Sequence, residues 1–180
     1  MRVPILTRDQ MTPEQQAVHD AAVAGKRGRM PPPAQAWIFS PELAMRTQHL
    51  GEFIRYDTAF GPALVEVAIL VTAKYWRSHY EWWAHRRLAE AAGLDAAIIN
   101  AIRDGKPLPP CDEKTQVIYD YARTLHETKQ IPLELHTRMV AAWGERGVAE
   151  IIGTCGYYTL VSMTLNGLDV GLPDGAVSEI

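Results

Sequence analysis

The composition is that of a folded globular protein and not of a disordered or fibrous one. Its 180 residues fit the usual range of about 100–200 residues for one domain, enough to bury a substantial core. Hydrophobic residues make up 47% and charged residues 22%. The formal net charge of -3, from 18 Lys and Arg against 21 Asp and Glu, lacks the positive excess typical of nucleic-acid binding. We therefore predict one domain over residues 1–180 that binds no nucleic acid.

The sequence predicts neither export nor membrane insertion. The N-terminal MRVPILTRDQ lacks the run of about 7–15 apolar residues of a secretory signal. The apolar stretch 148–168 is interrupted by Glu150, Asn166 and several glycines, so it is a better buried helix than a membrane span. Cys111 and Cys155 form no CxxC motif, so neither a disulfide framework nor a thiolate zinc site is indicated. We expect a cytoplasmic protein with no membrane partner.

Helix start signals recur along the first half of the chain. Thr12-Pro13-Glu14-Gln15 combines an N-cap, a proline in the first turn and a capping box, and Gly25 provides a stop. The basic and proline-rich KRGRMPPP, residues 26–33, cannot continue that helix and is predicted as a loop. Ser40-Pro41-Glu42 starts a second helix, which ends at the Phe60-Gly61-Pro62 break.

The second half continues the helical pattern. No Gly or Pro occurs between the ends of the segment 62–93, and a glycine stands at its stop position. Asp95 and Asp112 can cap the two helices that follow. A further helix runs from Pro132 to Gly144, and the last one, from about Val148, is apolar on nearly every face, as a central helix should be. With no hairpin signal or alternating run, the sequence predicts an all-α fold of about seven helices and a frayed tail, GLPDGAVSEI.

Side chains able to move protons are concentrated in residues 66–85. On a helix, Glu81 lies three residues after Ser78 and four residues before His85, so the three side chains share one face. A carboxylate beside an imidazole is a plausible acid/base pair, because it orients the ring and raises the pKa of the imidazole. The neighbouring Trp82 can help to exclude water from such a pair.

Glu66 joins this site only if the chain folds back. A continuous helix would hold it about 28 Å from His85, at 1.5 Å per residue. Ser78-His79-Tyr80-Glu81 has the S-x-x-E pattern of a capping box, so a new helix can start at Ser78 after a break near residues 75–77. The same pattern leaves two interpretations open for Ser78 and Glu81: they cap a helix, or they belong to a site.

The spacing of these residues resembles the core motif of the carboxymuconolactone decarboxylase and alkylhydroperoxidase D superfamily. The peroxidase branch reads E, eleven residues, C-x-x-C-x-x-x-H; counting from Glu66 places its cysteine positions at Ser78 and Glu81 and its histidine at His85. Tyr80-Glu81-Trp82 followed by His85 is similar to the Y-E-W-x-x-H of the decarboxylase-like branch. The defined motif covers residues 62–93.

The resemblance implies an alkylhydroperoxidase D-like helical fold that assembles as a homotrimer or homohexamer, with pockets near subunit contacts. It also implies a cofactor-independent lyase that acts on a small carboxylated lactone or unsaturated acid. Ser78 and Glu81 replace both cysteines, so the low-pKa thiolate and resolving partner of a dithiol peroxidase are missing. Peroxidase activity is therefore disfavoured.

We assign the catalytic role to His85 as proton donor, with Glu66 or Glu81 orienting the ring or relaying the proton. An arginine is expected to hold the substrate carboxylate. No third ligand accompanies Glu81 and His85, so a metal site is not predicted. The predicted substrate-binding residues are Ser78, Arg77, Arg86, Trp82 and Tyr158.

Several alternatives stay open. The chain can be a non-catalytic oligomeric binding or scaffold protein, or a related isomerase or hydrolase that uses the same groups. Lys26, Arg27 and Arg29 can attract an anionic ligand or form a solvated loop. His126 and His136 are predicted at the surface.

Overall fold

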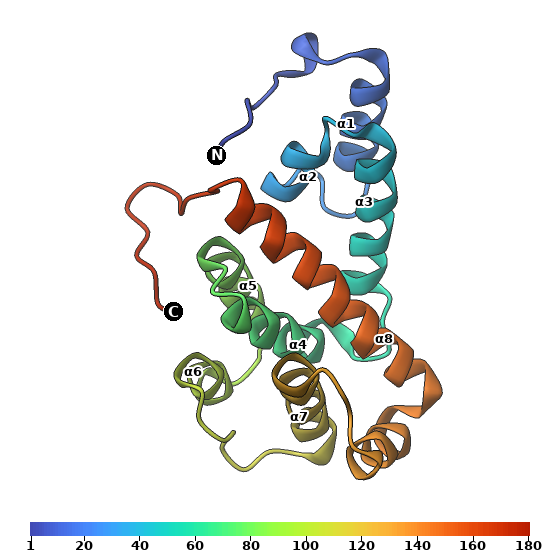
Figure 1. Ribbon diagram of the computed structural model, residues 1–180, viewed down its shortest axis with the longest axis vertical. Helices are drawn as coiled ribbons and strands as arrows, with labels where there is room; N and C mark the ends of the chain where they lie inside the picture. The colour runs from blue at the N-terminus through green and yellow to red at the C-terminus, as the bar shows by residue number, and fades with distance from the viewer.

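The computed structural model describes residues 1–180 and confirms the predicted all-α fold, with eight α-helices, one short 3-10 helix and no strand (Figure 1). The elements, in chain order, are the 3-10 helix η1 (Arg8–Gln10), α1 (Pro13–Ala24), α2 (Pro32–Trp37), α3 (Pro41–Tyr56), α4 (Gly61–Tyr75), α5 (His79–Ala91), α6 (Ala96–Asp104), α7 (Glu113–Thr128) and α8 (Leu133–Gly167).

Local capping signals account for where several helices begin. The Thr12 hydroxyl accepts from the backbone N–H of Gln15, and the Gln15 side chain accepts from the backbone N–H of Thr12, which completes the predicted capping box of α1. Asp95 and Asp112 cap α6 and α7 through backbone N–H groups at 2.8 Å. These three starts are confirmed.

The predicted break between α4 and α5 is present and turns the chain back on itself. Helix α4 ends at Tyr75, Arg77 takes a left-handed conformation with φ 49°, and α5 begins at His79. The two helices contact each other along their length. As a result, the α4 residue Glu66 lies next to the α5 residue His85.

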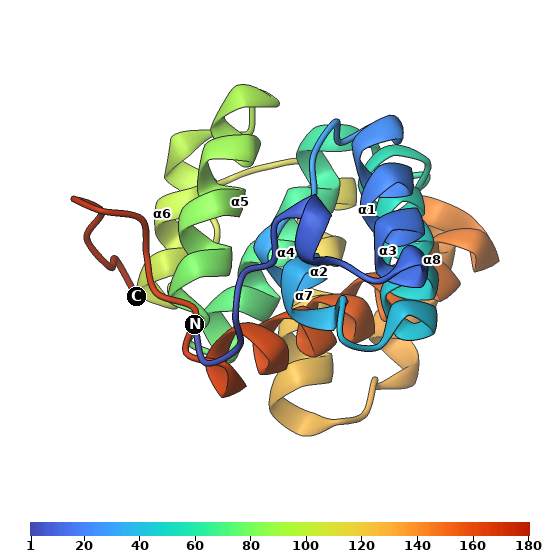
Figure 2. The same cartoon turned by 90° about the horizontal axis from the view of Figure 1, so that it is seen from above.

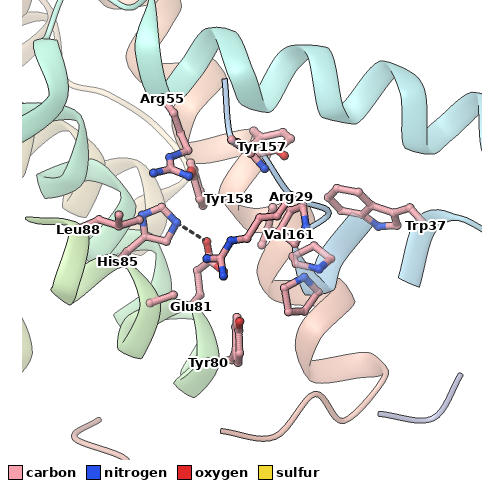
Figure 3. A pocket seen from close by; sticks show the side chains of 15 residues that line it. Arg29, Trp37, Arg55, Tyr80, Glu81, His85, Leu88, Tyr157, Tyr158 and Val161 are labelled. Atoms are coloured by element: carbon pink, nitrogen blue, oxygen red, sulfur yellow. Dashed lines mark ion pairs between the residues drawn. The ribbon is translucent and has the colours of Figure 1, made fainter. Parts of the chain in front are cut away.

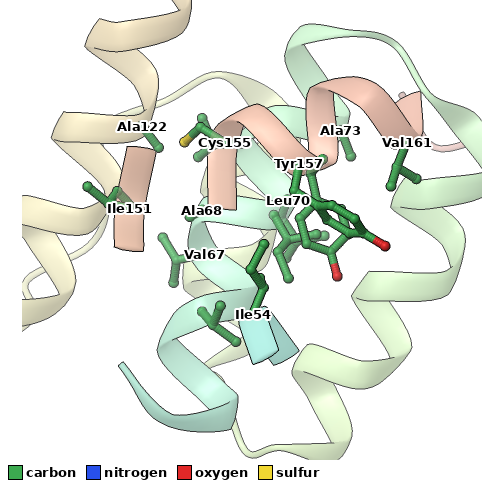
Figure 4. Packing of buried hydrophobic residues seen from close by; sticks show 14 of the residues in the cluster. Ile54, Val67, Ala68, Leu70, Ala73, Ala122, Ile151, Cys155, Tyr157 and Val161 are labelled. Carbon is green, nitrogen blue, oxygen red and sulfur yellow. The ribbon is translucent and has the colours of Figure 1, made fainter. Parts of the chain in front are cut away.

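Helix α4 lies at the centre of the fold. Its residues Val67, Ala68, Ile69 and Leu70 are completely buried and belong to one cluster of 33 buried hydrophobic residues (Figure 4). Helices α5, α7 and α8 all pack against it. The last helix was predicted as the central one, but Ile152 is 47% exposed and Met163 54% exposed on its outer side. The central position therefore belongs to α4, and α8 covers it from one side.

The remaining helices are arranged around α4 and α8. Helices α1 and α3 pack together on one side, and α5 and α6 lie on the other side (Figure 2). The N-terminal segment runs to the end of α8, where the Arg2 backbone N–H donates to the carbonyl of Leu168 at 2.6 Å. None of the helices has both the length and the hydropathy needed to cross a membrane.

Two segments differ from the sequence prediction. Residues 26–33 were predicted as a loop, but α2 begins inside that segment at Pro32, because a proline fits the first helical turn, where its missing N–H is not needed. The helix end predicted at Gly144, by contrast, is present: Gly144 leaves the helical conformation at φ 67°, and α8 comprises the two helical stretches on either side of this kink. The tail predicted to be frayed lies against α5, where Glu179 accepts hydrogen bonds from Trp82 and Arg86.

Candidate active site

A buried chain of three ionisable side chains joins α4 to α5. The Nδ1 of His85 lies 2.6 Å from a carboxylate oxygen of Glu66, and its Nε2 lies 2.9 Å from a carboxylate oxygen of Glu81. All three side chains are 5–7% exposed. The fold therefore brings together the three residues that were predicted as catalytic.

The two carboxylates hold His85 in its charged form. Burial alone lowers the pKa of an imidazole, but the charges and hydrogen bonds of Glu66 and Glu81 outweigh that effect and raise the pKa of His85 to about 9. At neutral pH the ring is an imidazolium that donates through both nitrogens.

Ser78 does not form the capping box that its sequence pattern allows. Its hydroxyl is fully buried and makes no hydrogen bond. The Glu81 carboxylate bonds His85 and not the backbone N–H of Ser78, as a capping box would require. The sequence left two interpretations open, and the one in which Ser78 and Glu81 cap α5 is wrong. The Glu81 carboxylate is thus available to the site, whereas Ser78 does not line the pocket described next.

A small pocket of about 70 Å³ opens beside Glu81 and His85 (Figure 3). The Tyr158 ring stands edge-on to the His85 ring, with 4.9 Å between the ring centroids. Burial, together with the charges of Glu81 and Glu66, raises the pKa of Tyr158 well above its usual value, so its phenol stays protonated. The remaining walls come from the 26–33 segment, α2, α3, α5 and α8, and consist of Arg27, Arg29, Pro31, Pro32, Pro33, Trp37, Arg55, Tyr80, Ala84, Leu88, Tyr157 and Val161.

Three arginines surround this pocket without acidic partners. Arg27 and Arg29 come from the segment before α2, and Arg55 comes from α3. No carboxylate of the chain forms an ion pair with any of them, and the Nε of Arg27 is buried without a hydrogen-bond partner. Figure 3 shows the side chains of Arg29 and Arg55 extending toward the Glu81–His85 pair. Unpaired guanidinium groups around a small pocket favour an anionic ligand.

Close packing positions Arg27. The hydroxyl of Tyr157 and the guanidinium of Arg27 both lie against Gly51 of α3. A Cβ atom at Gly51 would overlap the Tyr157 hydroxyl and would lie 2.6 Å from an Arg27 nitrogen. The absence of a side chain at this position lets both groups reach the wall of the pocket.

The structure leaves four of the five predicted substrate-binding residues outside the pocket, Ser78 among them. Arg86 follows His85 directly, so it lies about 100° further round α5, where it pairs with Glu90 and Glu179. Trp82 is buried in the core, with its indole N–H donated to Glu179 at 3.2 Å. Arg77 is exposed at the α4–α5 break and lines a different hollow. Of the predicted binding residues, the pocket contains Tyr158.

Sequence reasoning did not assign Arg55 and Tyr80 to a pocket. The basic loop with Arg27 and Arg29 carried a signal, since an anionic ligand was one of its two interpretations. No sequence pattern pointed to Arg55, because it lies within a helix and outside any motif. It reaches the pocket only through the packing of α3 against α8.

His126 was predicted at the surface, and this prediction is wrong. Its side chain is buried, its Nε2 lies 2.8 Å from the hydroxyl of Thr72, and its ring stacks on Tyr75. Burial, aided by the charge of Lys129, lowers the pKa of His126 to about 4. The other histidine of that prediction, His136, is half-buried.

Glu66 and Glu81 bind opposite nitrogens of His85, so the three residues do not converge on one point. The chain contains no group of three or more His, Cys, Asp or Glu side chains arranged to hold a metal ion.

Comparison with known protein families and with curated proteins found no match to this chain.

Proposed function

We propose that this chain is a cofactor-independent lyase of the carboxymuconolactone decarboxylase type, acting on a small carboxylated lactone or unsaturated acid. One observation carries the proposal: a buried Glu66–His85–Glu81 chain ends at a small pocket surrounded by unpaired arginines. The resemblance of the 62–93 segment to that superfamily supplies the reaction class.

The three ionisable groups divide the proton-transfer work between them. Glu66 does not line the pocket, so its role is to orient the ring and stabilise the imidazolium. His85 supplies the proton, and Glu81, which bonds Nε2 of the ring and also lines the pocket, relays it. Tyr158, a neutral phenol against the ring, limits the access of water.

The arginines hold the substrate and stabilise the charge that develops. In the decarboxylation, the bond between the carboxylate carbon and the ring breaks, carbon dioxide leaves, and the electron pair moves toward the lactone carbonyl. A guanidinium of Arg29 or Arg55 would stabilise the resulting enolate oxygen. The proton that Glu81 relays from His85 then adds to carbon, and solvent restores the imidazolium.

The size and chemistry of the pocket narrow the choice of substrate and reaction. A volume of about 70 Å³ is well below the roughly 300–1,000 Å³ of typical ligand sites, so the pocket favours the smallest acids of this class. Dithiol peroxidase chemistry stays disfavoured, because Cys111 and Cys155 both lie outside the pocket and burial raises the pKa of Cys155 to about 12.

The test is turnover of a panel of small carboxylated lactones and unsaturated acids, followed by ultraviolet absorbance and carbon dioxide release. Once a substrate is found, His85→Gln should lower kcat by roughly 10²–10⁴-fold, because a positioned general acid is lost while a side chain of similar size remains. His136→Gln is the control, since it makes the same substitution at a half-buried histidine that does not line the pocket.

Two outcomes would contradict the lyase proposal. Wild-type turnover by His85→Gln would remove the proton-transfer role, and with it the roles given to Glu66 and Glu81. Tight binding of a small carboxylate at His85 with no turnover of any substrate in the panel would favour the non-catalytic binding or scaffold protein instead.

A further inference from the structure

A second cavity lies between α4, α6 and α7 and shares no lining residue with the pocket at His85. Its volume is about 200 Å³. A protein cavity of about 150 Å³ can hold a benzene molecule. This cavity is therefore large enough for one aromatic ring with a small substituent.

Most of the cavity wall is apolar or aromatic. Val71 comes from α4, Ile102 from α6, and Tyr119 and His126 from α7. The Tyr119 hydroxyl already donates to the backbone carbonyl of Lys106 at 3.0 Å, so it presents its ring to the cavity. Such walls favour a flat hydrophobic body in the ligand.

The charged residues at the cavity leave one positive charge unpaired. Arg123 is bound to Glu127 at 2.8 Å. Lys74, at the end of α4, is half-buried and makes neither an ion pair nor a side-chain hydrogen bond within the chain. An anionic group on the ligand would pair with Lys74 and be reached by the guanidinium of Arg123.

His126 adds a hydrogen-bond acceptor to the same wall. The Thr72 hydroxyl donates to the Ala68 carbonyl at 2.8 Å, so its oxygen accepts from the Nε2–H of His126. The low pKa of this histidine keeps the ring neutral, which leaves Nδ1 unprotonated. Nδ1 makes no hydrogen bond within the chain, so it can accept one from a ligand hydroxyl.

We propose that this cavity is a second ligand site, which binds a small aromatic carboxylate that also carries a hydroxyl group. The ring lies among Val71, Ile102 and Tyr119, the carboxylate pairs with Lys74, and the hydroxyl donates to Nδ1 of His126. The proposal does not depend on the reaction assigned to the other pocket.

The experiment uses three probes: 4-hydroxybenzoate, benzoate, and the neutral 4-hydroxybenzyl alcohol. Methyl NMR of the 180-residue protein reports the place of binding, because Val71 and Ile102 line this cavity and Val161 lines the other pocket. Calorimetry reports affinity. We expect 4-hydroxybenzoate to shift the Val71 and Ile102 methyl signals and to bind at least tenfold more tightly than the neutral alcohol, with benzoate between them.

Lys74→Gln should weaken 4-hydroxybenzoate at least tenfold while leaving the neutral alcohol unchanged. Lys114→Gln removes the same charge from an exposed position outside the cavity and should bind like the wild type. The proposal is overturned if shifts appear at Val161 alone, if acid and alcohol bind equally, or if Lys74→Gln binds the acid as tightly as the wild type. Unshifted Val71 and Ile102 methyls at millimolar 4-hydroxybenzoate would overturn it as well.

Discussion

The two buried histidines of this chain have opposite electrostatic surroundings. His85 lies between the carboxylates of Glu66 and Glu81, which raise its pKa to about 9 against the cost of burial. His126 has a hydroxyl and an aromatic ring as neighbours, so burial lowers its pKa to about 4. One histidine is therefore charged at neutral pH and the other is neutral.

These shifts predict how stability depends on pH. The unfolded pKa of a histidine is about 6.5, so the stabilisation from charged His85 is complete below about 6.5 and is lost as pH rises toward 9. The stabilisation from neutral His126 has the opposite pH dependence: it is complete above about pH 6.5 and is lost as pH falls toward 4.

Urea unfolding between pH 4 and pH 9 tests this assignment. His85→Gln should flatten the decline in the free energy of unfolding between pH 6.5 and pH 9, and His126→Gln should flatten the decline between pH 4 and pH 6.5. The test compares the slopes of the free energy of unfolding against pH. The absolute free energies are not compared, because each substitution changes them as well. An unchanged alkaline slope in His85→Gln would show that the ring is not held in its charged form.

Gly51 allows a second residue-scale prediction. Gly51→Ala should destabilise the protein by about 1–3 kcal/mol, because the new methyl group overlaps the buried Tyr157 hydroxyl, and overpacking outweighs the helix propensity gained. Gly153→Ala is the control: it is also helical, but exposed and with nothing within 4 Å of its added Cβ. Thermal unfolding should show Gly153→Ala at or above the wild-type Tm; the prediction fails if both variants behave alike.

At the scale of the element, the α4–α5 break decides whether a site exists. Residues 66 and 85 would stand about 28 Å apart on one helix, yet the break at Arg77 brings their side chains to 2.6 Å. Helix α5 starts at this break without help from the Ser78 side chain. Backbone hydrogen bonds make the turn, since the Ser78 N–H donates to the Ala73 carbonyl and its own carbonyl accepts from Trp82.

Ser78→Ala should therefore leave the free energy of unfolding unchanged or raise it, because the buried hydroxyl it removes makes no hydrogen bond. Asp112→Ala is the comparison, since the carboxylate of Asp112 caps α7; its loss should cost about 0.5–2 kcal/mol. Urea unfolding of both variants gives the measurement. A cost for Ser78→Ala as large as that for Asp112→Ala would mean that its hydroxyl stabilises the start of α5.

At the scale of the molecule, the outer sides of α3 and α8 carry apolar side chains that the single chain leaves uncovered. Leu43, Leu50 and Phe53 of α3 are 39–45% exposed, and Ile152 and Met163 of α8 are also exposed. The two helices contact each other. Apolar groups gathered on neighbouring helices are typical of a surface that another subunit covers.

We expect light scattering at micromolar concentration to give three or six times the mass of one chain, the homotrimer or homohexamer that the resemblance implies. Leu50→Glu combined with Met163→Glu should shift the protein toward smaller species, because charge on this surface opposes association. Leu133→Glu, an equally apolar but more exposed position at the start of α8, should leave the mass unchanged. A monomeric wild type would contradict the prediction.

The sequence alone determined those features that depend on residues close together along the chain. The capping box at Thr12 and the caps at Asp95 and Asp112 were predictable, because each reports contacts within a few residues. The spacing of Glu66, Glu81 and His85 was recognisable for the same reason. The break before α5 was placed correctly, but from a capping box at Ser78 that the structure does not form.

Only the tertiary structure decided which other side chains join that motif. Arg55 reaches the pocket because α3 packs on α8, and Arg86 leaves it because one residue along α5 changes its direction by about 100°. Likewise, the burial of His126 depends on α7 packing against α4. Local patterns specify where helices begin and end, but which faces meet depends on how the whole set of apolar side chains packs into one core.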